Sequence, residues 1–202
     1  MARSARYCVP YRRRRDGKTD YEARRAFIVA GKPRLVVRGS IKNVITQILL
    51  AKPRGDEVLV SAHSRELMKN YGWKGSGGNV SAAYLTGFLC GHKAKAKGVE
   101  EAIPDIGLRS PSKGARIFAA LKGVLDAGIE VPHSEEKLPD EKRIGGEHIS
   151  KYAESLSPGS EEYQVKFSGY LERKLQPETL PDHFAQVKKD IVAAFKKGGK
   201  EK

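Results

Sequence analysis

The stretch Arg34–His63, RLVVRGSIKNVITQILLAKPRGDEVLVSAH, contains the clearest strand signals of the 202-residue chain. β-Branched residues gather in three short runs, at 34–38, 43–51 and 57–63, and residues 52–55 have the composition of a turn. Short runs of this kind, bounded by turn residues, are typical of strands rather than helices. We therefore predict three consecutive strands that form most of one sheet.

Downstream of these strands, the pattern changes to helical spacing. A glycine-rich loop at 71–78 leads to Asn79, a suitable N-cap for a helix that runs to about Lys97. Residues 102–107 have the features of a fourth, short strand, and Ser110-Pro111 is typical of the start of another helix. The order βββαβα predicts an α/β fold with a mixed sheet flanked by helices.

Small residues mark one side of the helix predicted at 79–97. Its apolar side comprises Val80, Ala83, Tyr84, Gly87 and Phe88. Ala83, Gly87 and Gly91 would let this helix approach the sheet closely, because a short side chain leaves room for a neighbouring backbone.

Both ends of the chain differ from this core. Residues 1–20 read as an extended arm, since Pro10 and Gly17 oppose a helix, and Asp20 is a plausible N-cap for a short helix that ends at Ala30. After Pro132 the composition becomes acidic and polar, and three helical stretches are predicted at 141–156, 161–174 and 182–197. We divide the chain into a basic arm (1–25), an α/β core (26–131) and a helical extension (132–202).

The net charge of +14 is concentrated in the first quarter of the chain. Residues 1–54 contain 15 Lys and Arg against 3 Asp and Glu, whereas residues 132–202 contain 13 of each kind. A block of one sign repels itself unless a partner neutralises it. The block therefore indicates a polyanionic partner, either nucleic acid or an anionic membrane.

The composition of the arm favours nucleic acid. Arg12–Arg15 are consecutive, and arginine forms bidentate bonds to phosphate and stacks on bases. Tyr7, Tyr11 and Tyr21 are interleaved and offer further stacking faces. A disordered tail or a localisation signal is the alternative interpretation. Membrane binding is the weaker one, because the block lacks the apolar face of an interfacial helix, and we expect no transmembrane helix.

No motif predicts catalysis, a cofactor or a metal site. The glycine-rich loop lacks the Gly-Lys-Ser/Thr ending of a Walker motif, and Val80 stands where a Rossmann fingerprint needs glycine. Asp105 is a lone acid, which we interpret as structural, so the carboxylate cluster of a metal-dependent nuclease is missing. The cysteines, Cys8 and Cys90, are too far apart for a zinc motif, and we expect Cys90 to be buried in a reduced cytosolic protein.

Eight segments of the chain are distinctive as a set: YRRRRDGKTDY (11–21), GKPRLVVR (31–38), SAHSREL (61–67), YGWKG (71–75), AAYLTG (82–87), DIGL (105–108), KGARIFAALKG (113–123) and PHSEE (132–136). Together, over about residues 7–153, they resemble one family, the universal 5S-rRNA-binding proteins of the large ribosomal subunit, in their archaeal form. The resemblance implies a three-layer α/β domain with a mixed sheet, and a protein with no enzymatic activity. It also implies a role in docking 5S rRNA onto the 23S rRNA in the central protuberance, within the cytoplasmic ribosome.

The resemblance and the charge block together give a set of expected RNA-binding residues. In the family, the basic arm threads between the two RNAs, the loop after the first strand touches 5S rRNA, and the glycine-rich loop provides aromatic and basic groups. The expected residues are Tyr11, Arg12, Arg13, Arg14, Arg15, Lys18, Tyr21, Arg24, Arg25, Arg34, Arg38, Ser40, Lys42, Asn43, Gln47, Tyr71, Trp73 and Lys74. We also expect neighbouring large-subunit proteins as partners, and we expect no binding to a membrane.

Overall fold

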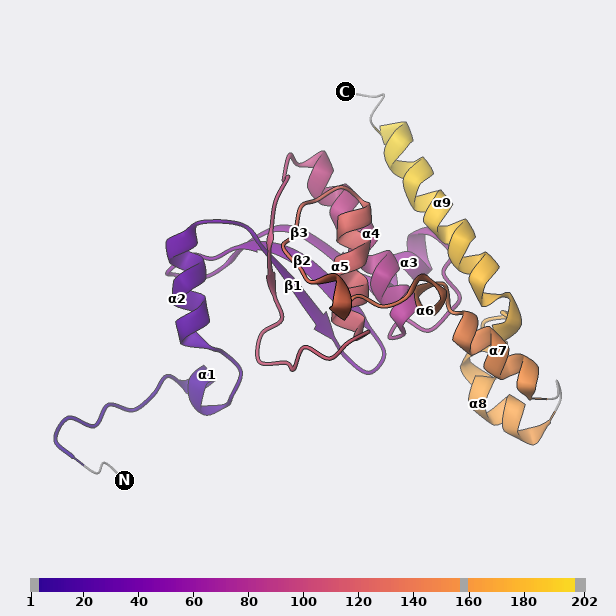
Figure 1. Ribbon diagram of the computed structural model, residues 1–202, viewed down its shortest axis with the longest axis horizontal. Coiled ribbons are helices and arrows are strands. Elements are labelled where there is room, and N and C mark those ends of the chain that lie inside the picture. The colour runs from indigo at the N-terminus through magenta and orange to yellow at the C-terminus, as the bar shows by residue number, and fades with distance from the viewer. Residues whose placement is uncertain (1–3, 157–159, 199–202) are drawn as a thin grey trace.

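A four-stranded mixed sheet forms the centre of the protein (Figure 1). The computed structural model describes residues 4–156 and 160–198. The strands are β1 (Arg34–Gly39), β2 (Val44–Leu50), β3 (Glu57–His63) and β4 (Ile103–Asp105), in the order β3-β2-β1-β4. β1 pairs antiparallel with β2 and parallel with β4, and β2 pairs antiparallel with β3. All four predicted strands are confirmed, and so is the mixed sheet.

Alternation along the strands separates the two faces of the sheet. Leu35, Val37, Ile48 and Val60 point to one face and are buried in the main hydrophobic core. The residues that alternate with these along the strands point to the other face. Examples are Arg38 of β1 and Ile45, its cross-strand partner on β2. The strand register therefore decides which side chains remain available at the surface.

Two helices cover the apolar face, α4 (Val80–Ala96) and α5 (Arg116–Asp126). Asn79 caps α4 as predicted, because its side chain accepts a hydrogen bond from the Ala82 N–H. The prediction of a single apolar side underestimates the burial of this helix. α4 is buried on almost all sides, among the sheet, α5 and C-terminal helices. The close approach is also to a helix rather than to the sheet: a Cβ on Gly87 would lie 1.9 Å from the Ala120 carbonyl oxygen.

The helix α2 (Tyr21–Ala30) lies on the opposite face of the sheet and forms a thin third layer (Figure 1). Its start is confirmed, because the Asp20 side chain accepts hydrogen bonds from the Glu22 and Ala23 N–H groups. The arm before it is not wholly extended, since Arg12–Arg15 form one helical turn, α1. Arginine favours helix, and this turn ends where Gly17 adopts a positive φ of 60°.

Several helix boundaries differ from the prediction. α5 begins at Arg116 rather than at Ser110-Pro111, because Gly114 adopts a left-handed φ of 70° just before it. A short helix, α3 (Ser64–Asn70), was not predicted; His63 and Glu66 close a capping box at its start. The segment 141–156 divides into α6 (Glu141–Gly145) and α7 (Glu147–Ser155), because Gly146 between them has a φ of 91°.

The C-terminal helices share the core of the α/β region. After α7, the chain forms α8 (Glu161–Leu171) and α9 (Leu180–Gly198). α9 packs on α4, α6 and α7, and its Val187 and Ile191 are buried in the main core cluster. Tyr163 and Phe167 of α8 form a small second cluster with Ala153 of α7.

Candidate nucleic-acid interface

The arm presents its arginines to solvent. Arg12–Arg15 are exposed, and in the described part of the chain none of them forms an ion pair with a carboxylate. Arg13 Nε donates to Thr19 Oγ1 at 2.7 Å, and Lys18 pairs with Asp16 at 3.3 Å. Arg12–Arg15 therefore carry a dense positive charge that the described residues leave unneutralised.

Two tyrosines stand beside these arginines. The rings of Tyr11 and Tyr21 lie 5.0 Å apart between centroids, tilted by 36°, and Tyr11 is 71% exposed. Tyr11 also begins the α1 turn, since its carbonyl oxygen accepts from the Arg14 and Arg15 N–H groups. Exposed aromatic faces among guanidinium groups can stack on bases while the arginines bind phosphates.

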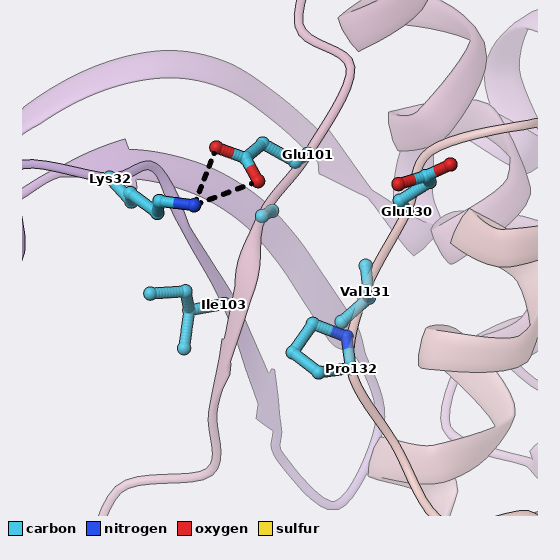
Figure 2. Close-up of a pocket in the computed structure, with 7 residues that line it drawn as sticks. Lys32, Glu101, Ile103, Glu130, Val131 and Pro132 are labelled. Carbon is cyan, nitrogen blue, oxygen red and sulfur yellow. Dashed lines mark hydrogen bonds and ion pairs between the residues drawn. The ribbon is translucent and has the colours of Figure 1, made fainter.

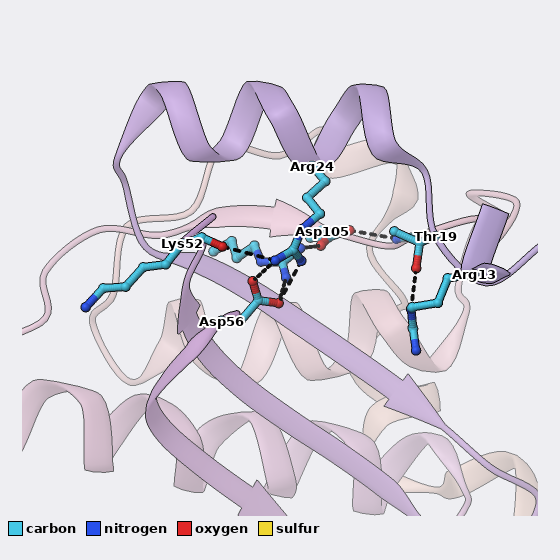
Figure 3. A network of polar contacts seen from close by, with 8 residues as sticks. Arg13, Thr19, Arg24, Lys52, Asp56 and Asp105 are labelled. Atoms are coloured by element: carbon cyan, nitrogen blue, oxygen red, sulfur yellow. Dashed lines mark hydrogen bonds and ion pairs between the residues drawn. The ribbon is translucent and has the colours of Figure 1, made fainter. Parts of the chain in front are cut away.

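A partly buried ion-pair network anchors the arm to the sheet (Figure 3). Arg24 of α2 reaches down to Asp56 at 2.9 Å and donates to the Lys52 carbonyl oxygen at 3.2 Å. Arg34 of β1, only 7% exposed, joins Asp56 to Asp105, with 2.5 Å between Arg34 Nη1 and Asp105 Oδ2. The network ties α2, β1 and β4 to the turn after β2.

Electrostatics at Asp56 favour this network. Burial raises the pKa of Asp56, but the hydrogen bonds and positive charges of Arg24 and Arg34 outweigh that effect and lower the pKa below its usual value. Asp105 also accepts from the Gly107 N–H at 2.9 Å, which fits the structural role predicted for it. Both carboxylates are therefore engaged within the protein, and so are Arg24 and Arg34. The structure gives these two arginines an anchoring position rather than a free surface for RNA, whereas Arg25 is exposed.

The loop after β1 forms a second exposed basic region. Arg38, Ser40 and Lys42 are exposed, and Ile41 at the loop tip is 92% exposed. The Ser40 N–H donates to the Asn43 carbonyl oxygen at 2.8 Å, which closes the turn. Gln47 lies half-buried on β2, on the face of the sheet that also carries Arg38, and its amide approaches Ser61 Oγ at 3.4 Å.

Two arginines that the sequence analysis did not select hold this loop in place. Arg109 Nη2 donates to the Gly39 carbonyl oxygen at 2.7 Å. Arg116 Nη1 donates to the carbonyl oxygens of Ser40 and Gly78, each at 2.8 Å. Neither arginine lies in a cluster of basic residues in the sequence, where they belong to the segments DIGLRS and KGARIF. No local pattern therefore marked them, and only the fold brings them to the loop.

The glycine-rich loop is placed differently from the prediction. Trp73 is 2% exposed, and its Nε1 donates to the Ser76 carbonyl oxygen at 3.2 Å. Its ring stacks on that of His183 of α9, with 5.2 Å between the ring centroids. Its ring faces are therefore covered by protein, so Trp73 is not available to stack on a base, contrary to the prediction. Tyr71 is half-buried, and only Lys74 of the three is exposed.

A pocket of about 620 Å³ lies at the β4 edge of the sheet (Figure 2). It is lined by Lys32, Glu101, Ala102, Ile103, Glu130, Val131 and Pro132. Lys32 and Glu101 pair at 3.0 Å across its mouth, so its only cation is already neutralised by a carboxylate. The pocket thus has no basic character that would connect it with the arm.

The part of the chain that the structure describes contains neither a candidate metal site nor a candidate membrane span. Across residues 4–156 and 160–198, no three His, Cys, Asp or Glu side chains gather in a way that could hold a metal ion. None of the helices in the same ranges combines the length and apolar character that crossing a membrane requires.

Comparisons with known proteins identify the family. A family model described as "Ribosomal large subunit proteins 60S L5, and 50S L18" matches residues 5–103 and 94–134. The chain is 54% identical over 197 residues to the large ribosomal subunit protein uL18 of Aeropyrum pernix, covering 97% of this chain and 92% of that protein. This agreement extends through the C-terminal helices, where the sequence motifs were least distinctive. The chain therefore belongs to the uL18 family of structural proteins of the large ribosomal subunit.

Proposed function

We propose that this large-subunit protein binds 5S rRNA and anchors it to the 23S rRNA in the central protuberance. The observation that carries the proposal is the arm: Arg12–Arg15 are exposed without carboxylate partners beside the rings of Tyr11 and Tyr21. Binding would release counterions from the RNA, and this release is the main source of affinity for a phosphate backbone.

The arm and the loop after β1 would act together as one interface. Arg24, held by Asp56, fixes the start of α2 and so limits where the arm can reach. Arg38 and Lys42 would add phosphate contacts from the end of β1, in the loop that Arg109 and Arg116 hold. In this arrangement phosphate contacts position the protein, and the tyrosines stack on unpaired bases.

The proposed parts of the chain have separate tasks. Residues 1–25 would bind RNA, residues 26–131 would hold the arm and the loop in register, and residues 132–202 would meet neighbouring large-subunit proteins. The last boundary is not a break in packing, since Ile144, Leu180 and Ile191 belong to the same core cluster as the sheet.

The test compares two variants that lose the same charge. In the first, Arg12, Arg13, Arg14 and Arg15 are replaced by alanine; in the second, Lys69, Lys142, Lys151 and Lys166, exposed lysines outside the proposed interface, are replaced. Affinity for 5S rRNA is measured against salt concentration. The first variant should bind more weakly and lose about 3 units from the slope of log K against log salt, at roughly 0.7–0.9 per phosphate contact. Equal slopes for both variants would refute the arm as the binding element.

A further inference from the structure

An apolar groove runs along one flank of α9. Its volume is about 520 Å³, and it lies between two rows of side chains that follow the i, i+4 spacing of the helix. One row is Phe184, Lys188, Val192 and Lys196, and the other is Ala185, Lys189 and Ala193. A groove between two such rows is the shape that receives a row of side chains from another helix.

The inner side of α9 is already occupied by the protein's own core. Val187 and Ile191 are buried, and Phe184 packs on Tyr84 with 5.6 Å between ring centroids. Phe195 stacks on His92 of α4 at 5.3 Å. The groove lies to the side of this packed face, and α9 alone supplies its lining.

The side chains at the edge of the groove carry positive charge, whereas the floor of the groove is apolar. Lys189 and Lys196 are exposed, and neither forms an ion pair within the residues whose contacts are known. Lys188 is directed inward: its Nζ donates to Tyr84 Oη at 2.6 Å and lies 4.9 Å from the centre of that ring. Its methylene groups therefore line the groove, while its charge is held at the Tyr84 side.

We propose that this groove binds an amphipathic, acidic helix of a neighbouring ribosomal protein. The apolar side of such a helix would fill the groove over Ala185, Val192 and Ala193, and its Asp or Glu residues would meet Lys189 and Lys196. RNA fits less well, because the floor offers no hydrogen-bond donor to phosphate. A second copy of this chain is disfavoured, because its own lysine rim would face the same charges.

A site-specific cross-linking experiment on assembled large subunits tests this inference. A photo-reactive amino acid replaces Ala185, which lines the groove, or Ala194, an exposed alanine nine residues later on the opposite side of α9. Irradiation of purified subunits should join position 185, but not position 194, to a ribosomal-protein peptide that is rich in Asp or Glu and has an apolar face. A cross-link to rRNA, to a second copy of the chain, or equally from both positions would overturn the proposal.

Charge reversal provides the second arm of the test. The double variant Lys189→Glu and Lys196→Glu should lower the cross-link yield at position 185 roughly tenfold, because like charges would then face each other across the contact. The variant Lys189→Arg and Lys196→Arg should retain the yield. An unchanged yield after charge reversal would contradict the acidic partner. The inference rests on the task proposed above for residues 132–202 but not on the arm, so affinity for 5S rRNA, measured on the same variants, reports separately on the RNA-binding part of the proposed function.

Discussion

At the scale of single residues, buried arginine has a different role from exposed arginine. Arg34 and Arg25 look equivalent in the sequence, but Arg34 lies between two carboxylates whereas Arg25 is exposed. Charge counting could not separate them, because the difference arises only when β4 brings Asp105 beside β1. Trp73 illustrates the same limit, since one of the residues that cover its ring is His183, far along the chain.

Replacing Arg34 by alanine should destabilise the protein, because Asp56 and Asp105 would lose their shared partner. We expect a loss of about 3 kcal/mol in the free energy of unfolding, as for other broken buried pairs. Arg25→Ala is the matched control, since it removes an exposed arginine from α2 and should change stability little. Urea denaturation measures both, and equal losses would contradict the anchoring role of Arg34.

Gly87 should not tolerate even a methyl group. In Gly87→Ala the new Cβ would lie 1.9 Å from the Ala120 carbonyl oxygen, so α4 and α5 would have to move apart. We expect a loss of about 3 kcal/mol, at the upper end for overpacking. Gly145→Ala, where the Cβ meets no atom within 4 Å, should be neutral or slightly stabilising. A thermal melt of Gly87→Ala that matches the wild type would contradict the close helix contact.

At the scale of elements, the docking of α9 should depend on pH through His183. Its Nε2 accepts a hydrogen bond from the Lys74 N–H at 3.0 Å, so the imidazole must be neutral there. Burial and then the charge of Lys74 lower the pKa of His183, while Asp190 opposes them. Because the folded-state pKa is lowered, the stabilisation is present above the unfolded pKa of about 6.5 and is lost as pH falls below it.

This pH effect can be followed through Trp73, the only tryptophan of the chain, which stacks on His183. Lowering the pH from about 7.5 to about 5.5, across the ordinary histidine pKa, should change Trp73 fluorescence and reduce stability. In His183→Gln the fluorescence change should disappear and the loss of stability should shrink. His92 and His148, whose pKa values are also lowered by burial, remain as further contributors. A wild-type response that persists in His183→Gln would exclude His183 as its source.

Sequence reasoning predicted elements well where local chemistry determines them. Asp20 and Asn79 act as N-caps as expected, and the third strand matches its predicted bounds at both ends. It failed where the backbone conformation of a glycine sets a helix boundary. The left-handed conformation of Gly114 shifts the start of α5 to a later residue, and that of Gly146 divides the segment 141–156 into two helices. Glycine tolerates both ordinary and left-handed conformations, so the sequence alone does not reveal which one is used.

At the scale of the whole molecule, the charge asymmetry and the fold together define the candidate interface. The arm was predictable because its arginines and tyrosines are contiguous in sequence. The clamp of Arg109 and Arg116 on the loop after β1 was not, since these residues lie about 70 positions beyond the loop that they hold. The fold also provides the ion pairs that attach α2 to the sheet, and these fix the point from which the arm extends.

The central claim, that the arm lies against 5S rRNA, can be tested from within the arm itself. Cys8 is exposed, whereas Cys90 is buried and its thiol pKa is raised to about 12 by burial, so an iron chelate can be attached at Cys8 selectively. Hydroxyl radicals generated there in the assembled subunit should cleave 5S rRNA and the adjoining 23S rRNA. Cleavage no greater than in a Cys8→Ser control would contradict the account.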